Sequence, residues 1–208
     1  MLLLAHTGIT LGLAALISSR RKLEAEPVSG VKTAGSSRFY WKPFLHSKAS
    51  LWLASLAKLI DVRILFIGAL LPDIIDKPLG QLILRDAISN GRIFAHTLLF
   101  FIIIALLGLY IYTKQRQLWL LVITFGVLTH LILDSMWETP KTLFWPLYGL
   151  AFPKENLGNW VLETHLGLVA NPAVYIPEFI GAAILIWFAL FLLQRKKTLS
   201  FIKCGRIE

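Results

Sequence analysis

The stretch from Leu118 to Trp137 reads LWLLVITFGVLTHLILDSMW and is apolar apart from a few polar residues, chiefly near its end. A helix that crosses a bilayer needs about 20 predominantly apolar residues, and this stretch has that length. His130 and Asp134 are four residues apart, so on a helix they lie on one face, one turn from each other. An ionisable residue inside a membrane span is costly and marks a functional site by default.

The His130–Asp134 pair has two interpretations. An imidazole nitrogen and a carboxylate oxygen are both good ligands of zinc, so the pair could bind one divalent metal ion. The same pair could instead be a hydrogen-bonded contact that only holds helices together. This stretch alone leaves both interpretations open.

Composition indicates an integral membrane protein. The chain has 208 residues, of which 56% are hydrophobic and 16% charged, whereas soluble domains are about 25% charged. Its net charge of +9 comes from basic residues between and after the apolar stretches, which is the positive-inside pattern and needs no nucleic acid. Cys204 is the single cysteine, so one chain cannot build a cysteine-based zinc site. Any metal must be held by histidines and carboxylates.

Hydropathy predicts an all-α fold, a polytopic membrane helical bundle formed as one domain over residues 1–208. About five transmembrane helices are expected, at residues 2–17, 51–71, 93–112, 118–137 and 174–193. The second span is expected to end in a turn at PDIIDKP, Pro72–Pro78, because two prolines bound it.

Basic residues set the expected orientation in the membrane. Lysine and arginine gather in residues 18–50, in TKQRQ (residues 113–117) and after Gln194, which places these segments in the cytoplasm. Alternation of five spans then puts the N-terminus outside and the C-terminus inside.

Under this topology, polar side chains from four spans reach one level near the outer face. They are His6, Asp73, Asp76, His96, His130 and Asp134. Imidazoles and carboxylates gathered at one depth are what a metal site requires, which favours a bound divalent metal, zinc above all, over a simple helix contact. His6 and Asp76 have an alternative interpretation, since each could instead be a helix cap or an interface group.

The other histidines are less informative. His46 falls in the basic inner loop and is expected at the surface. His165, with Glu163 nearby, lies on the outer side, and the sequence leaves open whether these two residues join the site.

Several motifs resemble the YdjM-type family of inner-membrane metal-dependent hydrolases. They are AHTGIT around His6, GALLPDIIDKP, GRIFAHTLLF, THLILDSMWETP and a following WPL, in this order over residues 1–150. The last span carries none of them. The resemblance implies Asp73, His96, His130 and Asp134 as metal ligands, with His6 as a further one.

Two departures from the family pattern bear on the number of metal ions. The family often has PDIDHP, whereas this chain has a carboxylate moved by one place and Lys77 in place of a histidine. The family also often has a histidine where Gly91 stands. The expected cofactor is therefore one or two zinc ions, the second being less supported than the first. The order of ligands is also similar, as a distant analogy, to helical zinc-dependent phospholipase C and nuclease.

The leading hypothesis is a metal-dependent hydrolase acting on a lipid or lipid-linked phosphoester at the outer membrane face. Asp76 is a candidate general base, with Asp73 as the other possibility, and Arg92 a candidate partner of a phosphate oxygen or, equally, a headgroup anchor. The alternatives are a non-enzymatic membrane protein with a structural metal site, and a metal or solute transporter. The expected partners are membrane lipid and a lipid-like substrate, without nucleic acid, and the oligomeric state stays open.

The topology can be checked directly. Reporter fusions after Lys114 and at the C-terminus should both report the cytoplasm, because both positions lie in lysine- and arginine-rich segments. A C-terminal reporter found outside would contradict this topology and the face assigned to the polar residues.

Overall fold

The protein is all-helical. A computed structural model describes residues 3–25, 60–154, 166 and 169–205, and no strand occurs among them. The five long helices are α1 (Leu3–Ala25), α3 (Val62–Pro78), α4 (Leu98–Gln115), α5 (Trp119–Leu133) and α8 (Pro172–Gln194). The short ones are η2 (Leu79–Ile83), η3 (Met136–Glu138), α6 (Pro140–Leu143) and α9 (Thr198–Cys204). The expected all-α class is confirmed.

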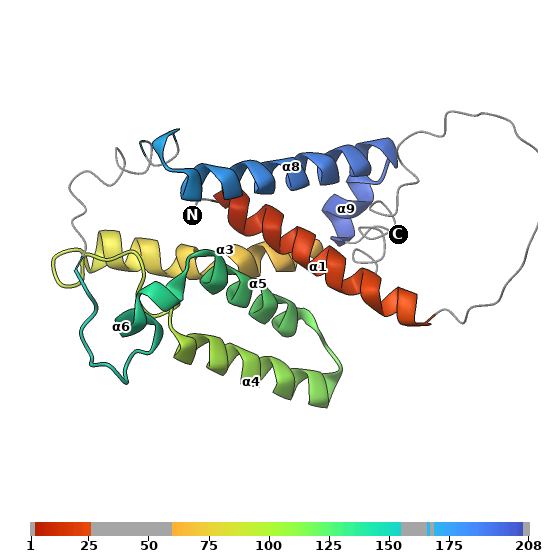
Figure 1. Cartoon of the computed structure of the whole chain (residues 1–208). Helices are drawn as coiled ribbons and strands as arrows, with labels where there is room; N and C mark the ends of the chain where they lie inside the picture. Colours follow the sequence, from red (N-terminus) through yellow and green to blue (C-terminus); the bar gives the residue numbers. More distant parts are fainter. Residues whose placement is uncertain (1–2, 26–59, 155–165, 167–168, 206–208) are drawn as a thin grey trace, which may run out of the picture.

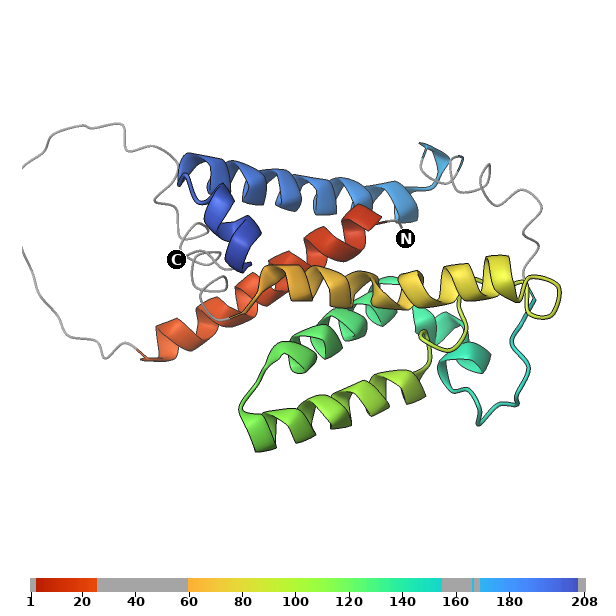
Figure 2. The same cartoon turned by 180° about the vertical axis from the view of Figure 1, so that it is seen from behind.

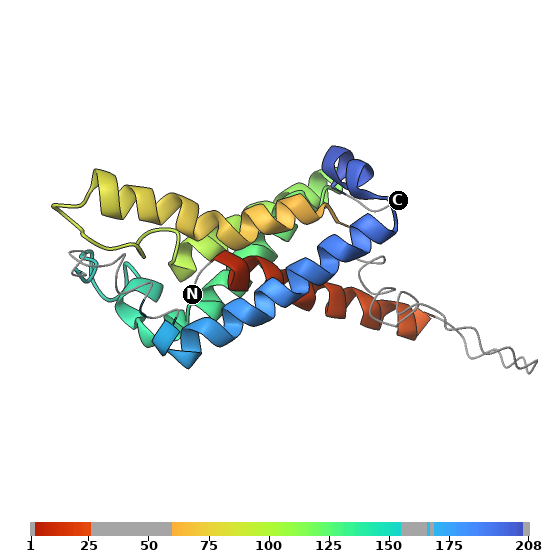
Figure 3. The same ribbon diagram turned by 90° about the horizontal axis from the view of Figure 1, so that it is seen from above.

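The long helices alternate in direction along the chain (Figure 1). The view from behind shows the same order, with the start of α1, the end of α3, the start of α4 and the end of α5 toward one end of the bundle (Figure 2). Helix α3 packs mainly on α5 and α1 mainly on α8, while α4 packs on α5. Seen from above, α8 crosses α1 (Figure 3).

Among the residues that the structure describes, two helices, α4 and α8, are long and apolar enough to cross a membrane. The apolar segments Leu3–Leu16 and Trp119–Leu133 are shorter. In α4 only Gly108 is buried, and large apolar side chains such as Leu106 (63% exposed) point outward. Such a surface suits contact with lipid. The five-span arrangement remains a prediction.

The predicted turn at Pro72–Pro78 is wrong, because α3 continues through it as a helix. Pro72 removes one amide from the helical hydrogen-bond ladder. Helix α3 is nevertheless packed against α5, and tertiary contacts of this kind override local propensity. One helical face therefore presents both Asp73 and Asp76, which are three residues apart.

The expected span 93–112 also differs from the structure, since α4 begins only at Leu98. Thr97 is its N-cap and accepts a hydrogen bond from the amide of Phe100 at 3.1 Å. His96 thus precedes the helix instead of lying in its first turn.

The bounds of the remaining spans shift as well. Helix α1 extends beyond the expected end at residue 17 to Ala25. Helix α3 begins at Val62, with Asp61 as its N-cap, and residues 51–59 of the second span lie outside the described part of the chain. Helix α5 ends at Leu133, so Asp134 is its C-cap.

Glycines bring helix backbones into direct contact at two places. A Cβ atom on Gly126 of α5 would lie 2.5 Å from the amide nitrogen of Ala69, and one on Gly68 of α3 would lie 2.6 Å from the carbonyl oxygen of Ile123. A Cβ on Gly8 of α1 would likewise overlap the backbone of Gly181 in α8. Small residues at such crossings allow the close packing that holds helices together in lipid.

Gly126→Ala should destabilise the protein by about 1–3 kcal/mol, because the added methyl group overlaps backbone that cannot move aside. Thermal unfolding in detergent would measure the loss. Gly12→Ala is the matched control, since its new Cβ would meet only the end of the Ile184 side chain, at 3.1 Å, and alanine favours the helix. An unchanged midpoint in Gly126→Ala would contradict the close contact.

Candidate metal centre

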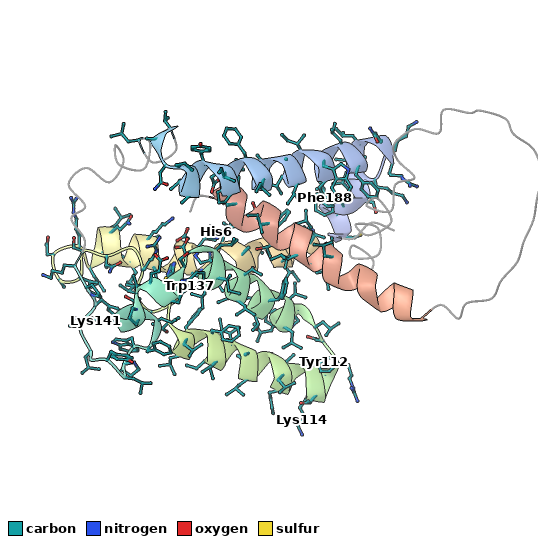
Figure 4. All side chains as sticks on the ribbon, in the orientation of Figure 1. His6, Tyr112, Lys114, Trp137, Lys141 and Phe188 are labelled. Carbon is teal, nitrogen blue, oxygen red and sulfur yellow. The ribbon has the colours of Figure 1, made fainter. Side chains whose placement is uncertain are left out.

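Four segments meet at one end of the bundle and bring the predicted polar residues together. His6 comes from α1, His96 from the residues just before α4, and His130 from the last turn of α5. Three aspartates complete the group: Asp73, Asp76 and Asp134. His6 lies at the same end of the bundle as Trp137, whereas Lys114 and Phe188 lie toward the other end (Figure 4). His46, Glu163 and His165 lie outside the described residues.

The ring of His130 is completely buried and held in one tautomer. Its Nδ1 atom lies 2.7 Å from the carbonyl oxygen of Ala69. A carbonyl oxygen can only accept a hydrogen bond, so Nδ1 carries the proton and donates it. In the neutral ring, Nε2 is then left with a free lone pair.

His96 is held in the same way by Asp76. Its Nδ1 atom donates to Oδ2 of Asp76 at 2.7 Å. The carboxylate of Asp76 is fully buried and also accepts backbone N–H bonds from Ile93 (2.8 Å), Ala95 (3.0 Å) and His96 itself (3.1 Å). Asp76 therefore fixes both the ring of His96 and the non-helical segment that carries it.

The two Nε2 atoms of His96 and His130 face each other at 3.1 Å. Because both rings carry their proton on Nδ1, two lone pairs point at one another. Oδ1 of Asp73 lies 3.6 Å from the first nitrogen and 3.8 Å from the second, which adds negative charge at the same point. This arrangement of donors fits a cation between them.

His6 adds a third, unsatisfied imidazole. Its ring is completely buried and stacks on the ring of His130, with centroids 4.0 Å apart. Neither ring nitrogen has a hydrogen-bond partner among the described residues. Nε2 lies 3.1 Å from Oδ1 of Asp134, without the geometry of a hydrogen bond. Buried polar atoms are nearly always satisfied, and an ion is one of the partners that would account for such an exception.

Two overlapping sets of three residues have ligand atoms within 4.8 Å of one another. One set is His6, Asp73 and His130, and the other is His96, His130 and Asp134. Nitrogen and carboxylate oxygen are ligands that zinc accepts in proteins. The residues therefore fit a divalent metal ion, and both sets share His130.

Two partly exposed cations border the cluster. Arg92 donates from Nε to Oδ2 of Asp134 at 2.8 Å, and its side chain is 36% exposed. Lys77 donates from Nζ to Oδ2 of Asp73 at 2.6 Å and is 44% exposed. Asp73 thus turns one oxygen toward the imidazoles and the other toward Lys77. Both oxygens of Asp134 lie near imidazoles, since Oδ2, which binds Arg92, is also 3.8 Å from Nε2 of His96. The terminal nitrogens of Arg92 have no hydrogen-bond partner within the described part of the chain.

Sequence reasoning missed two contributors. Lys77 follows Asp73 by four residues and would have been paired with it had PDIIDKP been interpreted as helix. The carbonyl of Ala69, which orients His130, leaves no signal in the sequence, because a backbone group is the same in every residue.

Comparison with known proteins identifies the family. The family model described as YdjM inner membrane protein matches residues 1–201, which is nearly the whole chain and includes the last span. No curated protein and no solved structure matches the chain. Because this family model covers residues 1–201, the chain belongs to the YdjM inner membrane protein family.

Proposed function

We propose that this protein is a membrane-bound metal-dependent hydrolase that cleaves a lipid or lipid-linked phosphoester at the outer face of the inner membrane. The observation that carries the proposal is the 3.1 Å distance between the Nε2 atoms of His96 and His130. In each ring the proton is on Nδ1, where it is donated to an acceptor outside the pair. Such a pair is stabilised by a cation.

Zinc is the ion that we infer, because only imidazoles and carboxylates are available and both are its usual ligands. His96 and His130 would hold it with Asp73 and Asp134, and His6 would hold it too or bind a second ion. The bound ion would supply a Lewis acid that activates water and polarises a phosphoryl oxygen.

We infer for Asp76 a role different from the general base that the sequence predicted. Its carboxylate is fully buried and already accepts bonds from three amides and the ring of His96. A carboxylate that binds the far nitrogen of a ligand histidine orients the ring and makes it more basic. Asp73 would be the better candidate for the base if Asp134 and not Asp73 binds the ion, because its Oδ1 faces the imidazoles and its side chain is partly exposed.

The cations at the border of the cluster favour a phosphoester substrate. Arg92 keeps its terminal nitrogens available, and a guanidinium group matches the geometry of phosphate oxygens. Lys77 adds a second positive charge on the side of Asp73. Together they would bind the anionic part of a headgroup while the acyl chains remain in the bilayer.

The two alternative functions fit less well. A structural metal site is closed by protein ligands, whereas this cluster has a partly exposed border at Arg92 and Lys77. A transporter needs polar groups across the membrane, and residues 98–112 and 118–128 contain no charged side chain.

Protein purified in detergent without chelator should contain about one equivalent of zinc, because the cluster has the ligands of a tight site. Elemental analysis would measure it. Hydrolysis of a phospholipid or lipid-linked phosphate should stop when chelator removes the ion and resume when zinc is returned. Less than about half an equivalent would count against the proposal, and bound zinc without any hydrolysis would favour a structural site.

His130→Ala and Asp134→Ala should each abolish metal retention in protein that still folds and inserts. Losing one ligand leaves too few to close the coordination sphere, and removing a polar group from an apolar span does not oppose insertion. Metal content and thermal unfolding, measured on the same samples, would show this.

Thr124→Val is the matched control, because the Thr124 hydroxyl bonds only to the carbonyl of Leu120 within α5. It should leave metal content unchanged. Full metal retention in Asp134→Ala would contradict the assignment of this residue as a ligand.

A further inference from the structure

The last long helix carries one charged residue, Glu178, at an unexpected place. Its side chain is buried, with 7% exposure, in the otherwise apolar sequence of α8. A carboxylate in an apolar span is costly and needs a compensating interaction. Glu178 is not one of the candidate metal ligands.

Glu178 binds the start of α1. Its Oε2 atom accepts the amide of Leu4 at 3.1 Å and the amide of Ala5 at 3.3 Å. The first amides of a helix have no partner within the helix and are usually capped by a side chain just before it. Residues 1–5 read MLLLA and offer no such side chain. Glu178 therefore caps α1 from across the fold, where the helix dipole also favours negative charge.

A glycine contact beside Glu178 fixes the same two helices against each other. A Cβ atom on Gly181, three residues after Glu178, would overlap the carbonyl of Leu4, and one on Gly8 would overlap the carbonyl of Gly181. No side chain separates the helices here, so α1 cannot slide along α8 without losing both the contact and the cap. The next residue after Ala5 is His6.

We propose that Glu178 is a positioning residue that sets the depth and rotation of α1, so that the buried ring of His6 stacks on His130 inside the cluster. The carboxylate holds the two amides immediately before His6, and the glycine contact holds the following turn. Helix α8 would thus contribute to the metal centre without supplying a ligand. The effect on metal binding rests on the proposed function, whereas the position of His6 does not.

Three variants test the proposal. Glu178→Met removes the acceptor and keeps the side-chain length, and Glu178→Gln keeps a carbonyl oxygen that can accept the same amides. Thr10→Val is the control, because Thr10 also ties α1 to the bundle through a buried hydrogen bond with Thr129, at 2.8 Å, one turn beyond His6.

The main measurement is the rate at which diethylpyrocarbonate modifies His6 in metal-free protein, read by mass spectrometry. The second is the visible absorption of protein loaded with cobalt(II), which reports the ligands around the ion. Thermal unfolding on the same samples separates a loss of stability from a movement of His6.

We expect Glu178→Met to raise the modification rate of His6 by roughly tenfold or more, to change the cobalt spectrum and to weaken metal binding roughly 10–100-fold, the range typical of residues that support ligands. Glu178→Gln should stay within about twofold of the unmodified protein in His6 reactivity, since it keeps the acceptor. Thr10→Val should lower the unfolding temperature while leaving both His6 readouts unchanged.

If Glu178→Met leaves the modification rate of His6 unchanged, with or without a loss of stability, the proposal is overturned. It is also overturned if His6 is as reactive in Glu178→Gln as in Glu178→Met. If Glu178→Met does not fold, Gly181→Ala tests the same contact, because its overlap with Leu4 must displace the first turn of α1. Unchanged His6 reactivity in that variant would also overturn the proposal. Protein that binds no metal but shows the expected His6 rates would refute the proposed function alone.

Discussion

The arrangement of the histidine–aspartate cluster depends on the backbone contact between α3 and α5 at Gly68 and Gly126. In a bilayer the lipid is as apolar as the helix surfaces, so helices associate through close packing and internal hydrogen bonds. Here the contact brings the carbonyl of Ala69 within 2.7 Å of the ring of His130, one turn beyond Gly126. The two glycines thereby decide which nitrogen of His130 faces the cluster.

The two histidines at the centre are oriented by acceptors of different strength. His96 donates to the charged carboxylate of Asp76, whereas His130 donates to a neutral carbonyl. A carboxylate raises the basicity of the imidazole that it holds. If the cluster binds an ion, the two Nε2 atoms would therefore be unequal donors, with His96 the stronger ligand of the pair. This asymmetry matters most if two ions share His130, because the weaker donor would then serve both.

Much of the site was predictable because it depends on charge and spacing along the chain. The distribution of lysine and arginine predicted that the ends of four spans lie on one side of the membrane. The structure brings His6, His96, His130 and the aspartates together at one end of the bundle. The path of the backbone between helices was not predictable in the same way. Two prolines suggested a turn at PDIIDKP, but packing against α5 keeps it helical. Thr97 is a recognisable N-cap and could have shown that α4 starts after His96. Glu178 could have been noticed as the only charge in its span.

Helix α5 has 15 residues and is therefore about 22 Å long, whereas the hydrocarbon layer of a bilayer is about 30 Å thick. If α5 spans the membrane, this hydrophobic mismatch must be relieved by local thinning of the bilayer or by polar groups reaching down to its end. His130 and Asp134 stand at that end, so headgroups would be drawn toward them by the membrane's own elasticity. The thickness of the surrounding bilayer, set by acyl-chain length, would then control how easily a lipid reaches the histidine–aspartate cluster.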